Sequence, residues 1–155
     1  MNVSLKLGVA ACAALLALPA SAETLDATNP RKLVEVIQDL GYRARLETDG
    51  VGDPMIISSA AGAEFRIYFY GCSRGKDCTT LLFKAGFDLI MGTTLETVDA
   101  WNEGALLGRA YLDDEDDPWI ELGVNMKGGV SRSNFEVTFG RWESILSDFQ
   151  RHIDF

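Results

Sequence analysis

Histidine, cysteine and positively charged side chains are all scarce in this sequence. Its 155 residues include one histidine, three cysteines and 14 lysines and arginines, against 23 aspartates and glutamates. The excess of negative charge would repel the phosphates of nucleic acids and of anionic membranes. The composition therefore argues against a nucleic-acid-binding protein and against a protein held on a charged membrane surface.

Long hydrophobic runs are also lacking, except near the N-terminus. Lys6 is followed there by an apolar stretch of 12 residues, and the small residues Ala20-Ser21-Ala22 stand before Glu23. Charge, apolar stretch and small residues in this order are typical of a signal peptidase substrate. The stretch is shorter than the roughly 20 residues that span a bilayer. We therefore predict a cleaved signal peptide over residues 1–22 and a mature protein, residues 23–155, that is periplasmic or secreted without stable membrane insertion.

Cys12 offers a second interpretation of the N-terminal segment. Val9-Ala10-Ala11-Cys12 loosely resembles the lipobox of bacterial lipoproteins, in which the cysteine becomes a lipidated N-terminus. Most of the apolar run follows Cys12 instead of preceding it, which favours the cleavable signal.

The mature part has the size of one domain. Residues 23–155 hold all 15 aromatic residues, enough for a hydrophobic core, and no repeat or low-complexity linker divides them. The formal charge of this part is −10, compared with −9 for the whole chain, because Lys6 is the only charged residue before Glu23. We expect a single acidic domain.

Two cysteines, Cys72 and Cys78, remain after removal of the N-terminal segment. They flank a loop between two apolar strands, and residues that flank such a turn lie close enough for a disulfide. An oxidising compartment favours that bond. The five residues between them do not match the C-x-x-C motif of redox enzymes, and two thiols with one distant histidine are too few ligands for zinc. The sequence predicts a structural disulfide.

Hydrophobic periodicity and turn residues predict three helices and six strands. The helices are expected at Pro30–Gly41, Thr94–Leu106 and from about Ser133 toward the C-terminus. The strands are expected at Tyr42–Thr48, Met55–Ser59, Glu64–Gly71, Thr79–Asp88, Arg109–Leu112 and Trp119–Met126. Short turns between consecutive strands favour an α+β fold, with a mostly antiparallel sheet flanked by helices in the order α-β-β-β-β-α-β-β-α. In the second helix, Leu95, Val98 and Trp101 form the expected buried stripe.

Neither the acidic loop nor the single histidine supports a catalytic site. The loop Asp113–Asp117 has the charge for calcium, but an EF-hand starting at Asp113 would place Pro118 where glycine is required and Val124 where a bidentate glutamate is required. A weaker cation site stays open there, beside the simpler interpretation as a solvated hairpin tip. His152 has no nucleophile motif to accompany it. We assign no catalytic residue, metal or cofactor, and we do not expect an enzyme.

Four side chains are candidate contacts for a ligand or partner. Trp101 falls on the stripe of the second helix and is interpreted as core, with Asn102 bonded to a neighbouring backbone segment. The alternative is that this pair contacts a ligand. Tyr111 and Trp119 stand on neighbouring strands around the acidic loop, where they either join the core or line an exposed binding face.

Short motifs are spread over residues 28–150 in a recognisable order and spacing. They are Leu40-Gly41-Tyr42, the turn Asp49–Pro54, Tyr68–Cys72 with its partner Cys78, Phe83–Phe87, Ala100-Trp101-Asn102, Arg109–Asp113, Lys127–Val130 and Trp142. Together they resemble the YbjN family, small bacterial domains labelled sensory transduction regulators. No single motif is specific, and the resemblance rests on their succession.

The resemblance implies a fold similar to the small dimeric chaperones of type III secretion, and with it a homodimer. The family has no established catalytic residues, so none is transferred to this chain. Those chaperones work in the cytosol, whereas this chain carries an export signal, so its clients must differ. Our leading hypothesis is an exported, non-enzymatic regulator or chaperone-like module that binds a protein or peptide. The alternative is a periplasmic sensor or binding protein for a small molecule or ion.

Overall fold

The structure, a computed structural model, describes residues 23–155 as three helices and eight strands. The predicted signal peptide, residues 1–22, lies outside the described residues. The helices are α1 (Pro30–Asp39), α2 (Leu95–Gly104) and α3 (Arg132–His152). The strands are β1 (Thr24–Leu25), β2 (Ala44–Thr48), β3 (Pro54–Ala60), β4 (Ala63–Tyr70), β5 (Thr80–Gly86), β6 (Arg109–Leu112), β7 (Pro118–Asn125) and β8 (Val130–Ser131). None of these helices is long and apolar enough to cross a bilayer.

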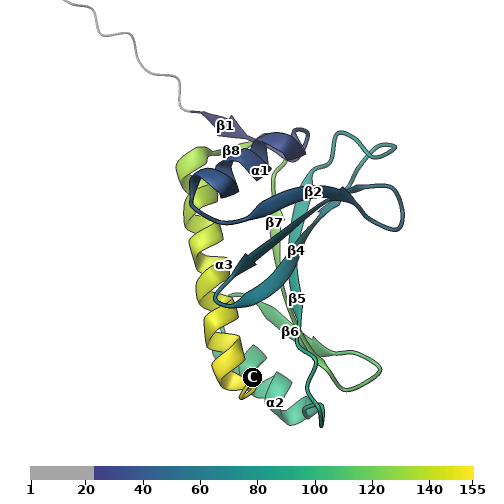
Figure 1. Ribbon diagram of the computed structural model, residues 1–155, viewed down its shortest axis with the longest axis vertical. Coiled ribbons are helices and arrows are strands. Elements are labelled where there is room, and N and C mark those ends of the chain that lie inside the picture. Colours follow the sequence, from purple (N-terminus) through teal and green to yellow (C-terminus); the bar gives the residue numbers. More distant parts are fainter. Residues whose placement is uncertain (1–22) are drawn as a thin grey trace, which may run out of the picture.

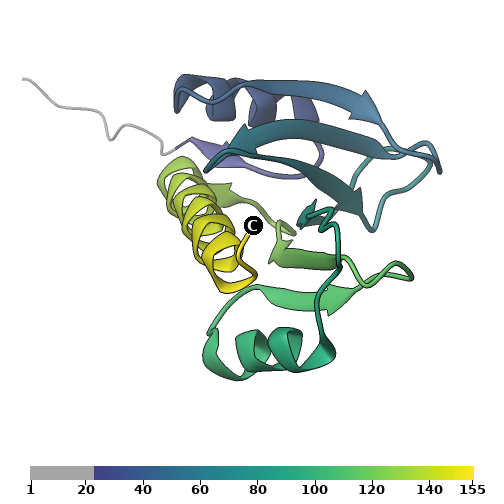
Figure 2. The same cartoon turned by 60° about the horizontal axis from the view of Figure 1, so that its bottom comes forward.

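Six strands form one antiparallel sheet in the order β2-β3-β4-β5-β7-β6. The sheet curves around α3, which lies along its concave face (Figure 1). From another direction, α1 lies at the β2 end of the sheet and α2 at the β6 end (Figure 2). The α+β class and the predicted order of the main helices and strands are therefore confirmed.

The core fills the space between α3 and the concave face of the sheet. Alternate residues of β4 and β5 point into it, including Phe65 and Phe83, as the period of two predicts. From α3, Phe139 and Trp142 reach the same rings, with centroids 5.6–6.3 Å apart. Apolar residues at helical spacing are buried along the inner face of α3 and just after its end: Phe135, Phe139, Trp142, Ile145, Leu146, Phe149 and Ile153.

A second, two-stranded sheet of β1 and β8 was not expected. It pairs Thr24 with Ser131 and Leu25 with Val130, and the side chain of Leu25 is buried. Ser131 also caps α3, because its hydroxyl accepts a hydrogen bond from the backbone N–H of Asn134. The small sheet thus fixes the start of the long helix beside the first described residues.

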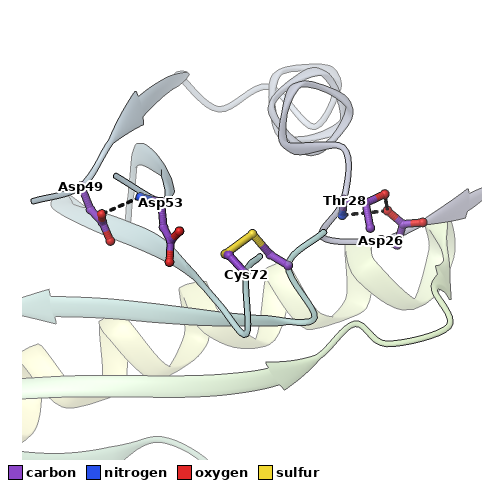
Figure 3. Close-up of a disulfide and its surroundings, with 6 residues drawn as sticks. Asp26, Thr28, Asp49, Asp53 and Cys72 are labelled. Atoms are coloured by element: carbon purple, nitrogen blue, oxygen red, sulfur yellow. Dashed lines mark hydrogen bonds between the residues drawn. A yellow bond between two sulfur atoms is a disulfide. The ribbon is translucent and has the colours of Figure 1, made fainter. Parts of the chain in front are cut away.

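The disulfide between Cys72 and Cys78 closes the tip of the β4–β5 hairpin, as the sequence indicates. Figure 3 shows it between the turn that carries Asp49 and Asp53 and the segment that carries Asp26. The carboxylate of Asp49 holds that turn by accepting the backbone N–H of Asp53 at 2.9 Å. The loop closed by the disulfide packs on that turn, because a Cβ on Gly75 would stand 2.9 Å from the carbonyl oxygen of Gly52.

The second helix differs from its prediction in length and in packing. It ends at Gly104 instead of Leu106, and Leu95 is 68% exposed although it belongs to the expected stripe. Only Val98 is buried and Trp101 is partly buried, because α2 lies at the β6 edge of the sheet (Figure 2). The apolar stripe of this helix was overestimated.

Candidate functional site

The convex face of the sheet is covered by no helix among residues 23–155 (Figures 1 and 2). Its side chains alternate with those that point toward α3, so one row crosses all six strands. We call this row the basic row; in strand order it is Arg45, Ile57, Arg66, Lys84, Glu121 and Arg109. Four of its six members are cations, in a domain whose net charge is strongly negative.

The three arginines of the basic row pair with nearby carboxylates. Arg45 contacts Glu47 at 3.3 Å, and Arg66 contacts Glu64 at 3.6 Å. Arg109 contacts Glu121 at 2.6 Å. The pairs of Arg45 and Arg66 are exposed on both sides and contribute little to stability, so a partner can replace these two contacts at small cost. The side chain of Glu121 is only 16% exposed, and Arg109 donates to it through two nitrogens.

Lys84 packs on two aromatic rings instead of a carboxylate. Its ammonium lies 4.7 Å from the ring centre of Trp119 and 5.1 Å from that of Tyr111. Partial burial disfavours the charged amine, but the nearby Tyr111 and Glu121 outweigh this effect, so the pKa of Lys84 is raised. Lys84 stays protonated and keeps a cation–π contact with both rings.

The indole of Trp119 is fixed against the convex face. Three atoms of its ring lie 2.5–2.7 Å from where a Cβ on Gly86 would stand, so only glycine leaves room for it. Its Nε1–H donates to the carboxylate of Asp113 at 2.8 Å. The ring of Tyr111 lies beside it, with centroids 6.4 Å apart and planes within 13°. Tyr111, Trp119 and Lys84 together form what we call the aromatic platform.

The acidic loop positions the aromatic platform. The hydrogen bond from Trp119, reinforced by the backbone N–H groups of Glu115 and Asp117, lowers the pKa of Asp113. Asp117 in turn accepts the backbone N–H of Leu89 at 2.9 Å. Within residues 23–155 no group of three or more side chains is arranged to hold a metal ion. The loop is a hairpin tip between β6 and β7 whose carboxylates fix neighbouring groups.

Trp101 and Asn102 lie apart from the aromatic platform, where they attach α2 to the sheet. The indole N–H of Trp101 donates to the carbonyl of Gly108 at 2.9 Å. The amide of Asn102 bonds both the N–H and the carbonyl of Ala110 in β6. The four candidate residues thus fall into two pairs with different surroundings, and only Tyr111 and Trp119 face outward from the sheet.

A cavity of about 420 Å³ lies between α2 and α3. Trp101 and Ile145 contribute apolar walls, and Arg141 and His152 lie at its polar border. The imidazole Nε2 of His152 lies 2.8 Å from the carbonyl of Thr97, and its ring packs on Trp101. His152 therefore joins the ends of two helices, and its ring is held by α2.

Sequence reasoning missed Lys84, the cation of the aromatic platform, and Gly86, which leaves room for the ring of Trp119. Both lie on β5, a strand that was predicted from the alternation of its apolar residues. The residues of that strand that point away from the core were not considered as candidate site residues. The alternation of that strand could have placed Lys84 on the exposed face. The contact between Gly86 and Trp119 depends on the register between β5 and β7, which no local pattern indicates.

Fold and site together define a small α+β domain with one packed and one open sheet face. The family model named YbjN, with the description "Putative bacterial sensory transduction regulator", matches residues 29–155. The chain belongs to the YbjN family. No curated protein and no solved structure matches the chain. The similarity to chaperones of type III secretion therefore stays a prediction.

Proposed function

We propose that this chain is an exported, non-enzymatic regulatory module that binds another protein through the convex face of its sheet. Membership in a family of regulatory domains supports the regulatory part of the proposal. The observation that carries the binding part is the aromatic platform. Trp119 is held on an uncovered sheet face by Asp113 and by the space above Gly86.

The chemistry of the convex face suits a protein partner. Tyrosine, tryptophan and arginine are the residues enriched at the centres of protein interfaces, and all three occur here. The platform is already positioned, so binding would not need to order Trp119 and Tyr111 and would avoid that entropic cost. The basic row also gives this face four cations with which a partner's carboxylates can interact.

Export is part of the proposal and rests on the N-terminal segment. Residues 1–22 have the order of a signal peptide, and the disulfide between Cys72 and Cys78 suits an oxidising compartment. Mass spectrometry of the protein isolated from the producing cell should find Glu23 as the first residue. A chain that starts at Met1, with both cysteines as thiols, would contradict export.

Site-specific photo-crosslinking in the producing cell tests the binding face. A benzoylphenylalanine in place of Tyr68, on the convex face beside Lys84, should give a discrete protein adduct. The same residue in place of Glu103, exposed on α2, is the matched control and should not give that adduct. Trp119→Ala should weaken the Tyr68 adduct. An adduct from Glu103 alone, or no adduct from Tyr68, would overturn the proposed face.

A second candidate function, a sensor for a small molecule, is favoured by the cavity between α2 and α3. Its volume of about 420 Å³ suits a small ligand, and it combines apolar walls with Arg141 and His152. A ligand that occupies it should raise the melting temperature of the protein. Ala105→Trp would fill the cavity and should abolish that rise, whereas Trp119→Ala should not change it.

A further inference from the structure

The two edge strands of the six-stranded sheet, β6 and β2, differ in whether their outward backbone groups are hydrogen-bonded. At the β6 edge, the side chain of Asn102 takes the place of a neighbouring strand by bonding both backbone groups of Ala110. At the β2 edge, no group among residues 23–155 bonds in this way to the second half of the strand. Natural sheets usually block their edges, because unpaired backbone groups attract another strand. The open edge at β2 therefore needs an explanation.

Three hydrogen bonds establish which backbone groups of β2 point outward. The carbonyl of Arg43 accepts the hydroxyl of Ser58 on β3, and the N–H of Asp49 donates to Asp53 across the turn. The carbonyl of Ala44 instead faces α1, where it accepts the side chain of Gln38. Because successive residues of a strand point their backbone groups to opposite sides, those of Leu46 and Thr48 also point outward. Within residues 23–155 they bond to nothing.

Two adjoining cavities form a groove along this edge, between β2 and α1. One cavity of about 400 Å³ lies at the start of β2, with Val34 on its α1 side. A second cavity, of about 450 Å³, continues along β2 toward Gly52. Arg31 and Leu46 line both. The groove therefore combines an unpaired strand edge with the side of a helix, which is the arrangement that accepts an extended peptide.

Arg31 gives the groove its charge preference. It is exposed, and no carboxylate among residues 23–155 lies within ion-pair distance of it. The two acidic residues that line the groove are already paired: Glu35 contacts Lys32 at 3.5 Å, and Glu47 contacts Arg45 at 3.3 Å. A carboxylate on a bound peptide would find a free guanidinium with two parallel donors. The negative charge of the whole domain opposes this only weakly, because salt screens charges beyond about 8 Å.

We propose that β2 accepts an extended peptide segment of another protein as a seventh strand, with an acidic side chain of that peptide bound to Arg31. The backbone of Leu46 and Thr48 supplies the hydrogen bonds, and the groove beside α1 takes alternate side chains. A second copy of this chain fits less well. It would bring its own α1 to the same edge, together with a further charge of −10.

The proposal is tested with random linear peptides displayed on phage and selected on the mature protein. The selected sequences should share an acidic residue within an alternating stretch. The synthetic peptide should lose affinity at least tenfold when N-methyl groups block the alternate N–H groups that face β2. It should lose about tenfold when its acidic side chain is replaced by the corresponding amide. N-methylation of the alternate residues whose N–H groups point away from β2 is the control.

Variants of the protein test the same contact from the other side. Leu46→Pro removes an outward N–H without breaking the ladder to β3, and Leu46→Val keeps that N–H. We expect Leu46→Pro and Arg31→Gln each to weaken the peptide about tenfold, and Leu46→Val to bind as the natural chain does. Trp119→Ala, on the convex face, should also leave peptide binding unchanged, so this result is independent of the proposed function.

Four outcomes would overturn the proposal. They are the selection of no peptide, peptides insensitive to Leu46→Pro and Arg31→Gln, peptides lost on Trp119→Ala, and a dimer in light scattering that Leu46→Pro dissociates. The last would assign the β2 edge to a second copy. Circular dichroism of each variant confirms that the fold is retained.

Discussion

Asn102 and Ala110 are joined by two hydrogen bonds, one from each end of the asparagine amide. The side-chain Nδ2 donates to the carbonyl of Ala110 at 3.0 Å, and the side-chain Oδ1 accepts its N–H at 2.8 Å. Ala110 is buried and belongs to the edge strand β6. A single side chain thus pairs with the strand edge as a neighbouring strand would, and it attaches α2 to the sheet.

Replacement of Asn102 by alanine should therefore destabilise the domain. We expect a loss of about 1–2 kcal/mol in the free energy of unfolding, because two hydrogen bonds to a partly buried strand are removed. Asn102→Asp should cost at least as much, since a carboxylate oxygen would face the carbonyl of Ala110. Urea unfolding measures both. Glu103→Ala, at the next and exposed position, should stay within about 0.5 kcal/mol of the natural chain.

The disulfide should contribute modestly to stability. It closes a short loop, and the chain-entropy model gives about 2 kcal/mol for such a loop. Cys72→Ser with Cys78→Ser should therefore lower the urea midpoint while the domain still folds. A reducing agent should shift the natural chain by a similar amount and leave the double variant unchanged. Complete unfolding on reduction would contradict this prediction and show that the whole domain depends on the Cys72–Cys78 disulfide.

Local patterns in the sequence were sufficient for the main elements of the fold. The alternation around Phe65 and Phe83 and the helical spacing from Phe135 to Phe149 each describe one face of one element, and burial follows from them. Strands of two residues, such as β1 and β8, have no period that a pattern could reveal. Their pairing depends on residues about a hundred positions apart in the chain.

The candidate site was harder to predict because it is defined by relationships between strands. Tyr111 and Trp119 were recognised as a pair, yet Lys84 and Gly86 join them only through the register of β5 with β7. The groove at β2 likewise depends on where α1 lies. Sequence reasoning therefore found the residues that carry an aromatic signal and missed those that position them.

Acid should loosen the contact between Asp113 and Trp119. The indole N–H, followed by the backbone N–H groups of the loop, lowers the pKa of Asp113 below its ordinary value of 3.8. A carboxyl group with a lowered folded pKa stabilises the fold fully above the unfolded pKa. That contribution is then lost as pH falls through the lower folded value. The hydrogen bond should thus persist down to about pH 3.8 and weaken below it.

The indole N–H signal of Trp119 in a proton–nitrogen NMR titration follows this change. Its midpoint should lie below 3.8. The indole of Trp101 donates to the carbonyl of Gly108, which does not titrate, so it serves as an internal control. Asp113→Asn should remove the titration of the Trp119 signal. A Trp119 midpoint at or above 3.8 would show that this hydrogen bond does not form in solution.

Gly86 and Gly123 provide a matched pair for testing the aromatic platform. A methyl group on Gly86 would stand 2.5 Å from the indole of Trp119, whereas one on Gly123 would meet nothing within 4 Å. Both glycines lie on the sheet, and neither has a positive φ, so backbone strain does not separate them. A difference in stability between Gly86→Ala and Gly123→Ala therefore reports whether the ring of Trp119 lies over Gly86.

We expect Gly86→Ala to cost about 1–3 kcal/mol of stability, the usual range when a close-packed contact is overfilled. Gly123→Ala should be neutral or slightly stabilising, because it restricts the unfolded chain without a clash. Gly86→Ala should also shift the indole signal of Trp119 and weaken the Tyr68 crosslink, since the displaced ring no longer lies flat on the sheet. Equal behaviour of the two variants would mean that Trp119 does not lie over Gly86, and the platform would lose its structural basis.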